Sequence, residues 1–283
     1  MTKDGTLNTH HVSRITYHVT MLTVATLNIL NDLTLWRERA PLIVEGLWAM
    51  QPDLIALQEV ALPSNNAQWI ADHLGGYSVH LCPKTGKKGR REALAILSRL
   101  PVDEHVTLPL ITQDRVAQRV RVQYNGARCV FANTHLYWNP LDDASRLKQA
   151  RSLLDWLPCD MPTLVCGDFN AEPHSGTIAA MRARFASAHE AANGYEPEYT
   201  CPTPLQRDRG LRQLARGLLA RLAGLLFKQV TDPWCGTLDY IFVDRTIRAH
   251  RCGVVFNQPS PHDSRLYPSD HFGLMASIQL EQP

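Results

Sequence analysis

Short apolar runs alternate with stretches of helical spacing at the start of the chain. Leu22–Leu27 and Asp53–Gln58 have the length and apolar content of strands. Between them, Trp36–Met50 carries apolar side chains three and four residues apart, which indicates a helix with one apolar face, and Asn66–Leu74 is a second segment of this kind. The pattern therefore predicts strand, helix, strand and helix in succession.

A longer series of strand-like runs follows. Turn-forming residues separate these runs, for example Asn125-Gly126, a pair typical of tight hairpins. The further predicted strands are Tyr77–Leu81, Ala93–Ser98, Val102–Leu108, Ala117–Tyr124, Arg128–His135, Thr163–Cys166, Leu238–Val243, Arg248–Phe256 and Gly273–Leu280. Two more helices are predicted over Asp142–Leu157 and Thr177–Arg184.

Strands mixed with helices, in two halves of similar size, predict an α/β fold. We expect a four-layer α/β sandwich, in which two mixed sheets pack face to face and helices lie outside. No linker or repeat divides the chain, so residues 21–283 are expected to form one domain. Residues 1–20 are polar and His-rich and precede the first strand, and we expect them to be a disordered N-terminal extension.

Composition narrows the class of protein. The hydrophobic share of 45% and charged share of 20% are ordinary for a globular chain, and the net charge of +2 gives no strong overall attraction for polyanions. The seven cysteines include no C-x-x-C pair, which favours a reducing compartment over a disulfide framework. No apolar run resembles a signal peptide or a membrane span, so a cytoplasmic location is expected.

Polar residues of a particular kind stand where the predicted strands end. Phosphodiester hydrolysis at neutral pH needs a metal to offset phosphate charge, an activated water and a stabilised leaving oxygen. Mg²⁺ prefers carboxylate oxygens, so isolated carboxylates with His and Asn nearby are the expected signature. Six segments fit, and alone each has an ordinary explanation such as a turn. They are Thr26-Leu27-Asn28, Ala56–Val60, Ala132–Leu136, Gly167-Asp168-Phe169-Asn170, Gly236–Ile241 and Pro268–Phe272.

In this order, the six segments resemble the endonuclease/exonuclease/phosphatase superfamily, which includes deoxyribonuclease I, neutral sphingomyelinases and poly(A)-deadenylases. The resemblance runs from about Leu22 to Leu280. It implies a metal-dependent phosphoric ester hydrolase that uses Mg²⁺, with Mn²⁺ expected to substitute. The segments Asn133–Pro140, Gly167–Pro173 and Thr237–Phe242 are similar to the deadenylase and nocturnin-like branch, whereas Glu92–Ser98 is similar to bacterial hydrolases with unassigned substrates.

The resemblance also implies roles for single residues. Glu59 resembles the principal Mg²⁺ ligand, Asn28 its neighbour at the metal, and Asp270 a second carboxylate on the metal side. Asp168 and Asn170 resemble the pair that orients the attacking water. His271 resembles the histidine that bonds a phosphate oxygen, Asp239 the acid that holds its ring, and His135 a second phosphate-binding histidine. Abasic-site endonucleases have an acidic residue two positions after the first Asn, where this chain has Leu30, which argues against that branch.

Other residues have two interpretations each. Tyr137 and Trp138, close to His135, either stack a nucleobase or pack in the core, and Asn139 and Arg119 are further candidates for substrate binding. The basic loop Lys84–Arg91 either follows a phosphate backbone or is a solvated surface loop. The Leu- and Arg-rich residues 205–228 either contact an anionic membrane peripherally or pack as an amphipathic helix over the sheet edge.

Three functions remain open from the sequence. The favoured one is a Mg²⁺-dependent phosphodiesterase that acts on nucleic acid or nucleotides. The alternatives are a phosphoesterase for a lipid head group or another small phosphoester, and a non-catalytic binding module on the same scaffold. The shared catalytic segments predict the reaction better than the substrate.

Overall fold

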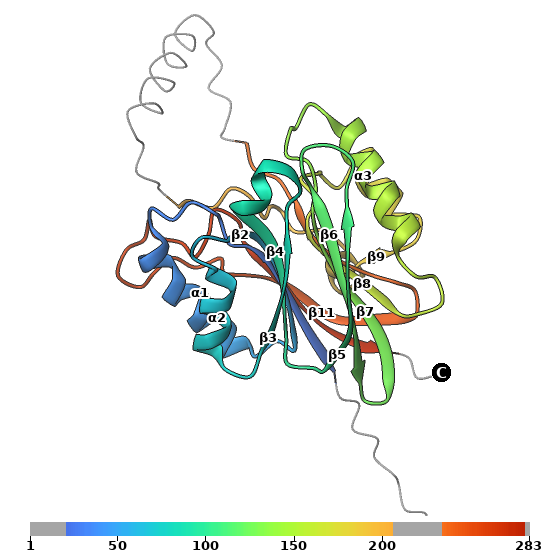
Figure 1. Cartoon of the computed structure of the whole chain (residues 1–283), viewed down its shortest axis with the longest axis horizontal. Coiled ribbons are helices and arrows are strands. Elements are labelled where there is room, and N and C mark those ends of the chain that lie inside the picture. The colour runs from blue at the N-terminus through green and yellow to red at the C-terminus, as the bar shows by residue number, and fades with distance from the viewer. Residues whose placement is uncertain (1–20, 206–233, 281–283) are drawn as a thin grey trace, which may run out of the picture.

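A computed structural model describes residues 21–205 and 234–280 and shows two six-stranded sheets (Figure 1). The first sheet has the order β11-β12-β1-β2-β4-β3. Its strands β1 and β2 are parallel, and the other neighbours are antiparallel, so the sheet is mixed. The strands are β1 (Leu22–Asn28), β2 (Leu54–Ala61), β3 (Ser78–Pro83), β4 (Glu92–Ser98), β11 (Ile247–Val255) and β12 (Gly273–Leu280).

The second sheet repeats this plan with other segments. Its order is β5-β6-β7-β8-β10-β9, and only β7 and β8 are parallel neighbours. The strands are β5 (Val102–Pro109), β6 (Val116–Tyr124), β7 (Ala127–His135), β8 (Thr163–Asp168), β9 (Ala186–Ser187) and β10 (Asp239–Val243). In both sheets the parallel pair is central, so the carboxyl ends of two strands meet at one edge.

Helices cover the outer face of each sheet. α1 (Trp36–Met50) and α2 (Asn66–Leu74) insert Ile43, Leu47 and Ile70 against the outward side chains of β1, β2 and β4. α3 (Asp143–Trp156) and α4 (Gly176–Arg182) do the same for the second sheet, and the short α5 (Ala188–Asn193) lies beside β11. The prediction of a four-layer sandwich is therefore confirmed.

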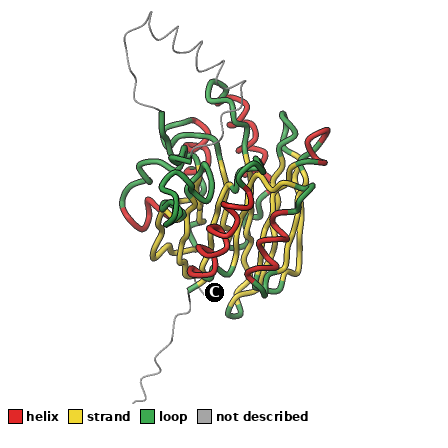
Figure 2. Tube along the Cα trace, turned by 90° about the vertical axis from the view of Figure 1, so that its left-hand side faces the viewer, coloured by secondary structure: helices red, strands yellow, loops and turns green. Residues whose placement is uncertain are grey.

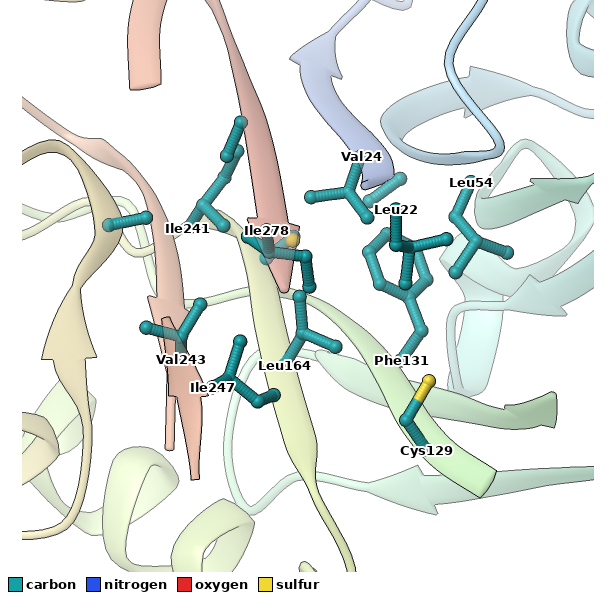
Figure 3. Packing of buried hydrophobic residues seen from close by; sticks show 14 of the residues in the cluster. Leu22, Val24, Leu54, Cys129, Phe131, Leu164, Ile241, Val243, Ile247 and Ile278 are labelled. Atoms are coloured by element: carbon teal, nitrogen blue, oxygen red, sulfur yellow. The ribbon is translucent and has the colours of Figure 1, made fainter. Parts of the chain in front are cut away.

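The core between the sheets consists of inward side chains from both (Figure 3). Leu22, Val24 and Leu54 of the first sheet face Phe131 and Leu164 of the second, and all five are fully buried. Burying one large apolar side chain contributes about 1.5–3 kcal/mol, so this interface holds the two sheets in a fixed relation. The site lies at the ends of these strands, so its residues are held in a fixed relation as well.

Most predicted elements agree with the structure. The helices at 36–50 and 66–74 and the last strand have the predicted bounds, and β8 continues to Asp168, two residues beyond the prediction. Helix α5, strand β9 and the 3-10 helix η1 (Gly86–Arg90) were not predicted, because they are too short for hydrophobic periodicity to indicate. The predicted extension 1–20 and all but the first residue of 205–228 lie outside the described residues.

The larger loops gather at the end of the sheets away from the C-terminus (Figure 2). The loops after β1, β2, β7 and β8 and the segments before β10 and β12 meet there, because both parallel pairs run in that direction. Among the described residues, no helix has the length and apolar character needed to cross a membrane.

Candidate active site

Three neighbouring strands of the first sheet bring polar groups to one edge. Asn28 is the last residue of β1, and Glu59 follows its register partner Gln58 on β2. Asp270 precedes β12, and the hydroxyl of the adjacent Ser269 donates to the carbonyl of Asn28 at 2.6 Å. The expected metal-side residues Asn28, Glu59 and Asp270 therefore lie on or just before adjacent strands at the same edge.

A bulge directs the side chain of Glu59. The pairing of β2 with β4 shifts register between Leu57 and Val60, and Glu59 adopts a left-handed backbone with φ of 58°. Bulges and left-handed non-glycine residues are uncommon and concentrate at functional sites. The half-buried carboxylate accepts a hydrogen bond from the backbone N–H of Asn31 at 3.0 Å. One Glu59 oxygen is thus fixed by the loop after β1.

The second sheet contributes three more residues. His135 ends β7, Asp168 ends β8 and Asp239 begins β10, and Asp168 is the direct register partner of both of the others. Before Asp168, Gly167 has φ of 141°, and a Cβ there would lie 2.0 Å from the carbonyl oxygen of Thr134. Only glycine fits, so the approach of β7 to β8 at the site depends on it.

Asp168 lies where the two sheets meet. Its Oδ2 accepts from the Asn28 amide at 3.1 Å, and its Oδ1 accepts from the Asn170 backbone N–H at 2.9 Å. The Nε2 atoms of His135 and His271 lie 3.4 and 3.9 Å from Oδ2. Burial raises the pKa of Asp168 from 3.8 to about 6, although the positive charge of His271 opposes this rise.

His271 and Asp239 form a buried pair. Nδ1 of His271 lies 2.9 Å from Oδ2 of Asp239, which also accepts from the hydroxyl of Thr200 at 2.7 Å. Burial lowers the pKa of His271, but the carboxylates of Asp239 and Asp168 and a hydrogen bond with Cys201 raise it well above 6.5. The two carboxylates therefore favour the protonated ring, whose Nε2 lies on the side of Asp168.

A set of charged residues that the sequence analysis did not single out borders the site. Lys84 and Glu92 form a buried ion pair, and Oε1 of Glu92 lies 3.9 Å from Nδ1 of His135. Arg115 is also buried and interacts electrostatically with Glu92, Asp168 and Glu59. Glu92 lies in the segment that is similar to bacterial hydrolases, and Lys84 begins the basic loop. No local sequence pattern marks Arg115 or Thr200 as a site residue.

The remaining expected residues divide between the site and other regions. Asn170 donates from its side chain to the carbonyl of Leu136 at 3.2 Å, beside Asp168. Tyr137 is half-buried and interacts electrostatically with Arg115, whereas Trp138 is 58% exposed, so neither is a fully buried core residue. Asn139 is half-buried, and its side chain caps the turn at Leu141.

Arg119 is not brought to the site. Its guanidinium lies 4.5 Å from the ring centroid of Trp156 on α3, donates to the Trp156 carbonyl at 2.7 Å and lies 3.8 Å from Glu104. The Trp156 contacts belong to the outer helix layer, and Glu104 lies on the neighbouring strand β5. The basic loop is likewise not uniformly solvated, because Lys84 at its start is buried in the ion pair with Glu92.

Arg39 ties the metal-side loops together. This fully buried side chain donates to the carbonyls of Ile29 and Leu30 after β1 and of Pro268 before β12, at 2.8–3.2 Å. A single guanidinium thereby fixes the loops that carry Asn28 and Asp270.

The donors on the metal side fit a hard divalent cation. Glu59, Glu92, Asp168, Asp239 and Asp270 are five carboxylates, and the nearby cations are Lys84, Arg115 and protonated His271. When all are ionised, two negative charges remain, which Mg²⁺ would balance. Ligand atoms of Asp168, Asp239 and His271 also lie within 4.8 Å of one another. A hard cation prefers oxygen to imidazole nitrogen, and the expected ligands Glu59, Asn28 and Asp270 offer carboxylate or amide oxygens.

The chain is similar to known proteins over most of its length. The model of the Endonuclease/Exonuclease/phosphatase family matches residues 25–271. Human nocturnin is 31% identical over 282 residues, which cover 87% of this chain and 59% of nocturnin. Mouse 2',5'-phosphodiesterase 12 is 29% identical over 204 residues, which cover 62% of this chain and 32% of that protein. The chain thus spans about a third to two thirds of the length of these curated relatives.

Solved structures share the fold. The human nocturnin catalytic domain with bound sulfate anion has a TM-score of 0.70 at 24% identity and covers 92% of this chain and 95% of that chain. Zebrafish (D. rerio) TDP2 complexed with a single-strand DNA product has a TM-score of 0.71 at 18% identity, with 92% and 99% covered. The two-sheet architecture is therefore a known scaffold.

Proposed function

The chain belongs to the endonuclease/exonuclease/phosphatase family, and we propose that it hydrolyses phosphodiesters with a divalent metal ion, in nucleic acid or nucleotides. The observation that carries the proposal is the position of Asp168. It is a buried carboxylate with a raised pKa, held between Asn28 at the end of β1 and the His271–Asp239 pair, in which His271 precedes β12 of the first sheet and Asp239 begins β10 of the second. Similarity to a 2',5'-phosphodiesterase supports the diester as the bond cleaved.

Glu59, Asn28 and Asp270 would hold the metal, with Mg²⁺ as the expected ion and Mn²⁺ as its substitute. When bound, the ion would offset the negative charge of the phosphate oxygens and so favour attack. The chain's own contribution is rigidity. Arg39 fixes the loops of Asn28 and Asp270, and the bulge on β2 orients Glu59.

Asp168 and Asn170 would orient the attacking water. A carboxylate whose pKa is about 6 remains basic enough to accept a proton near neutral pH. The water oxygen forms a bond to phosphorus as its proton passes to Oδ2 of Asp168. The bond from phosphorus to the leaving ester oxygen breaks, that oxygen takes up a proton from solvent, and Asp168 returns its proton to solvent.

His271 would stabilise the developing charge. Its protonated Nε2 faces Asp168, while Nδ1 is held by Asp239, so the ring can donate to a phosphate oxygen without turning. His135, on the other side of Asp168, would contact a second phosphate oxygen. Tyr137 and Trp138 would lie beside the group attached to the phosphate.

The alternatives have less support. The lipid head-group interpretation, and with it peripheral membrane contact, depends on 205–228, nearly all of which lies outside the described residues. A non-catalytic module would not explain the buried carboxylates at the strand ends, because burying charge without a function is unfavourable. The cytoplasmic location stays a prediction.

One assay separates these functions. Purified protein is given oligonucleotides, sphingomyelin and bis-(p-nitrophenyl) phosphate with Mg²⁺ or Mn²⁺, alongside EDTA and Asp168→Ala controls. We expect cleavage of oligonucleotides and of the nitrophenyl diester that EDTA and the substitution abolish. Cleavage of sphingomyelin alone would refute the nucleic-acid substrate, and activity that survives EDTA would refute the metal.

A further inference from the structure

Two basic side chains, one from each sheet, lie together at the edge of the site. Lys84 follows β3, and Arg115 precedes β6. Their segments are joined by a hydrogen bond from the Thr85 backbone N–H to the Asp114 carbonyl at 3.1 Å. The two cations are close enough to interact, because the charge of Arg115 lowers the pKa of Lys84.

The two cations differ in their partners. Lys84 is paired with Glu92. Arg115 is only 4% exposed, and within the part of the chain that the structure describes its Nε and Nη1 have no hydrogen-bond partner and no carboxylate lies within ion-pair distance. Buried charges are normally paired because desolvation is costly. A buried arginine with unused donors therefore indicates an anionic partner from outside the chain.

The location of Arg115 identifies that partner. The side chains that act on its charge are Glu92, Asp168, Glu59 and Tyr137. Asp168 and Glu59 are the proposed water-orienting and metal-binding carboxylates, so a phosphate between them would be within reach of the guanidinium.

We infer that Arg115 is a phosphate-binding residue, whose guanidinium donates to non-bridging oxygens of the substrate phosphoryl group beside the Lys84–Glu92 pair. This inference rests on the proposed function for the identity of the substrate. A guanidinium presents two donors in a plane and suits phosphate oxygens better than an ammonium group does. In the low-dielectric site, it would stabilise charge that grows as the ester bond breaks.

The test uses inorganic phosphate as the probe, so it does not depend on turnover. Phosphate binding to the full chain with Mg²⁺ is measured by calorimetry and by the rise in Tm, for wild type, Arg115→Met and Arg115→Lys. Arg121→Met is the matched control, because Arg121 lies on β6 but pairs with Asp103 and Glu104. Rates with bis-(p-nitrophenyl) phosphate are measured on the same samples.

We expect Arg115→Met to weaken phosphate binding at least ~10-fold and to lower kcat/KM by about 10²-fold, the usual effect of removing one preorganised donor. Arg115→Lys should fall between Met and wild type, and Arg121→Met should match wild type. The Tm of Arg115→Met without phosphate should not fall, because an unpaired buried charge is removed. If Arg115→Met does not fold, Arg115→Lys is compared with wild type instead. Wild-type phosphate affinity in the Arg115 variants, or no phosphate binding by wild type, would overturn the inference. Arg115-dependent phosphate binding without any hydrolysis would refute the proposed function alone.

Discussion

The side-chain amide of Asn28 donates to Oδ2 of Asp168 at 3.1 Å, a bond between residues 140 positions apart that joins the edges of the two sheets. The bond is buried at both ends. It forms because both central parallel pairs end at the same side of the sandwich. Asp168 of the second sheet thus contacts Asn28 of the first sheet and lies next to His271, which precedes β12 of the first sheet.

Replacing Asp168 by Asn should stabilise the metal-free protein at neutral pH. The pKa of Asp168 rises from 3.8 to about 6 in the fold, mainly through burial. The folded state therefore holds the Asp168 proton more tightly than the unfolded state does. The stability that this proton adds is fully present below pH 3.8 and is lost as pH rises through 6. Above pH 6 the charged carboxylate lowers stability, so Asp168→Asn should raise the Tm in EDTA by a few degrees at pH 8 and much less at pH 5.

The matched control is Asp160→Asn, which changes the same charge at an exposed position. Its Tm should follow wild type at both pH values. Asp168→Asn should also be inactive, which would show a stabilised but non-functional enzyme. An equal Tm change for Asp168→Asn at pH 5 and pH 8 would contradict the role of burial.

Replacing Glu59 by Gln should first lower the affinity of the protein for its metal ion. Gln keeps an oxygen that can accept from the Asn31 N–H, so the bulge should persist, but the negative charge is lost. We expect the Mg²⁺ concentration for half-maximal activity to rise at least ~10-fold, and calorimetry should show the same loss of affinity. Glu45→Gln, on the exposed side of α1, is the control. Equal Mg²⁺ affinity in Glu59→Gln and wild type would remove Glu59 from the ligand set.

The residues that sequence could identify share one property. Asn28 and Asp168 end apolar runs of strand length and Asp239 begins one, and a polar residue at the end of such a run can be seen in the local sequence. Lys84, Glu92 and Arg115 join the site only because the loop after β3 meets the turn before β6, a contact between the two sheets that no local pattern encodes.

Arg119 shows how strand parity decides a side chain's surroundings. Val120 on β6 packs in the core between the sheets, so Arg119, one residue earlier, faces the helix layer and Trp156. A shift of one residue would exchange these faces. The sequence predicts that β6 is a strand, but its alternation of Arg and Val does not show which face meets the other sheet.

Gly167→Ala should severely destabilise the fold. The left-handed φ of 141° disfavours any side chain, and the added Cβ would lie 2.0 Å from a backbone oxygen of Thr134, which cannot rotate away. Strand β8 would have to move from β7, which would separate His135 from Asp168. We expect a loss of several kcal/mol in the free energy of unfolding, measured by urea denaturation. Gly253→Ala on β11 meets no atom within 4 Å and should remain close to wild type.

Trp138→Ala should raise KM for a nucleic-acid substrate but not for a small phosphoester. Trp138 is 58% exposed and lies next to Tyr137, with ring centroids 6.1 Å apart, so its face is available to stack on a base. Stacking of a base on an aromatic ring contributes about 1–3 kcal/mol, so KM for an oligonucleotide should rise about 5- to 150-fold. KM for bis-(p-nitrophenyl) phosphate should change little, because its phosphate contacts are intact. Trp48→Ala removes a tryptophan of similar exposure on α1 and should alter neither value. Unchanged oligonucleotide KM in Trp138→Ala would show that this ring does not contact the substrate.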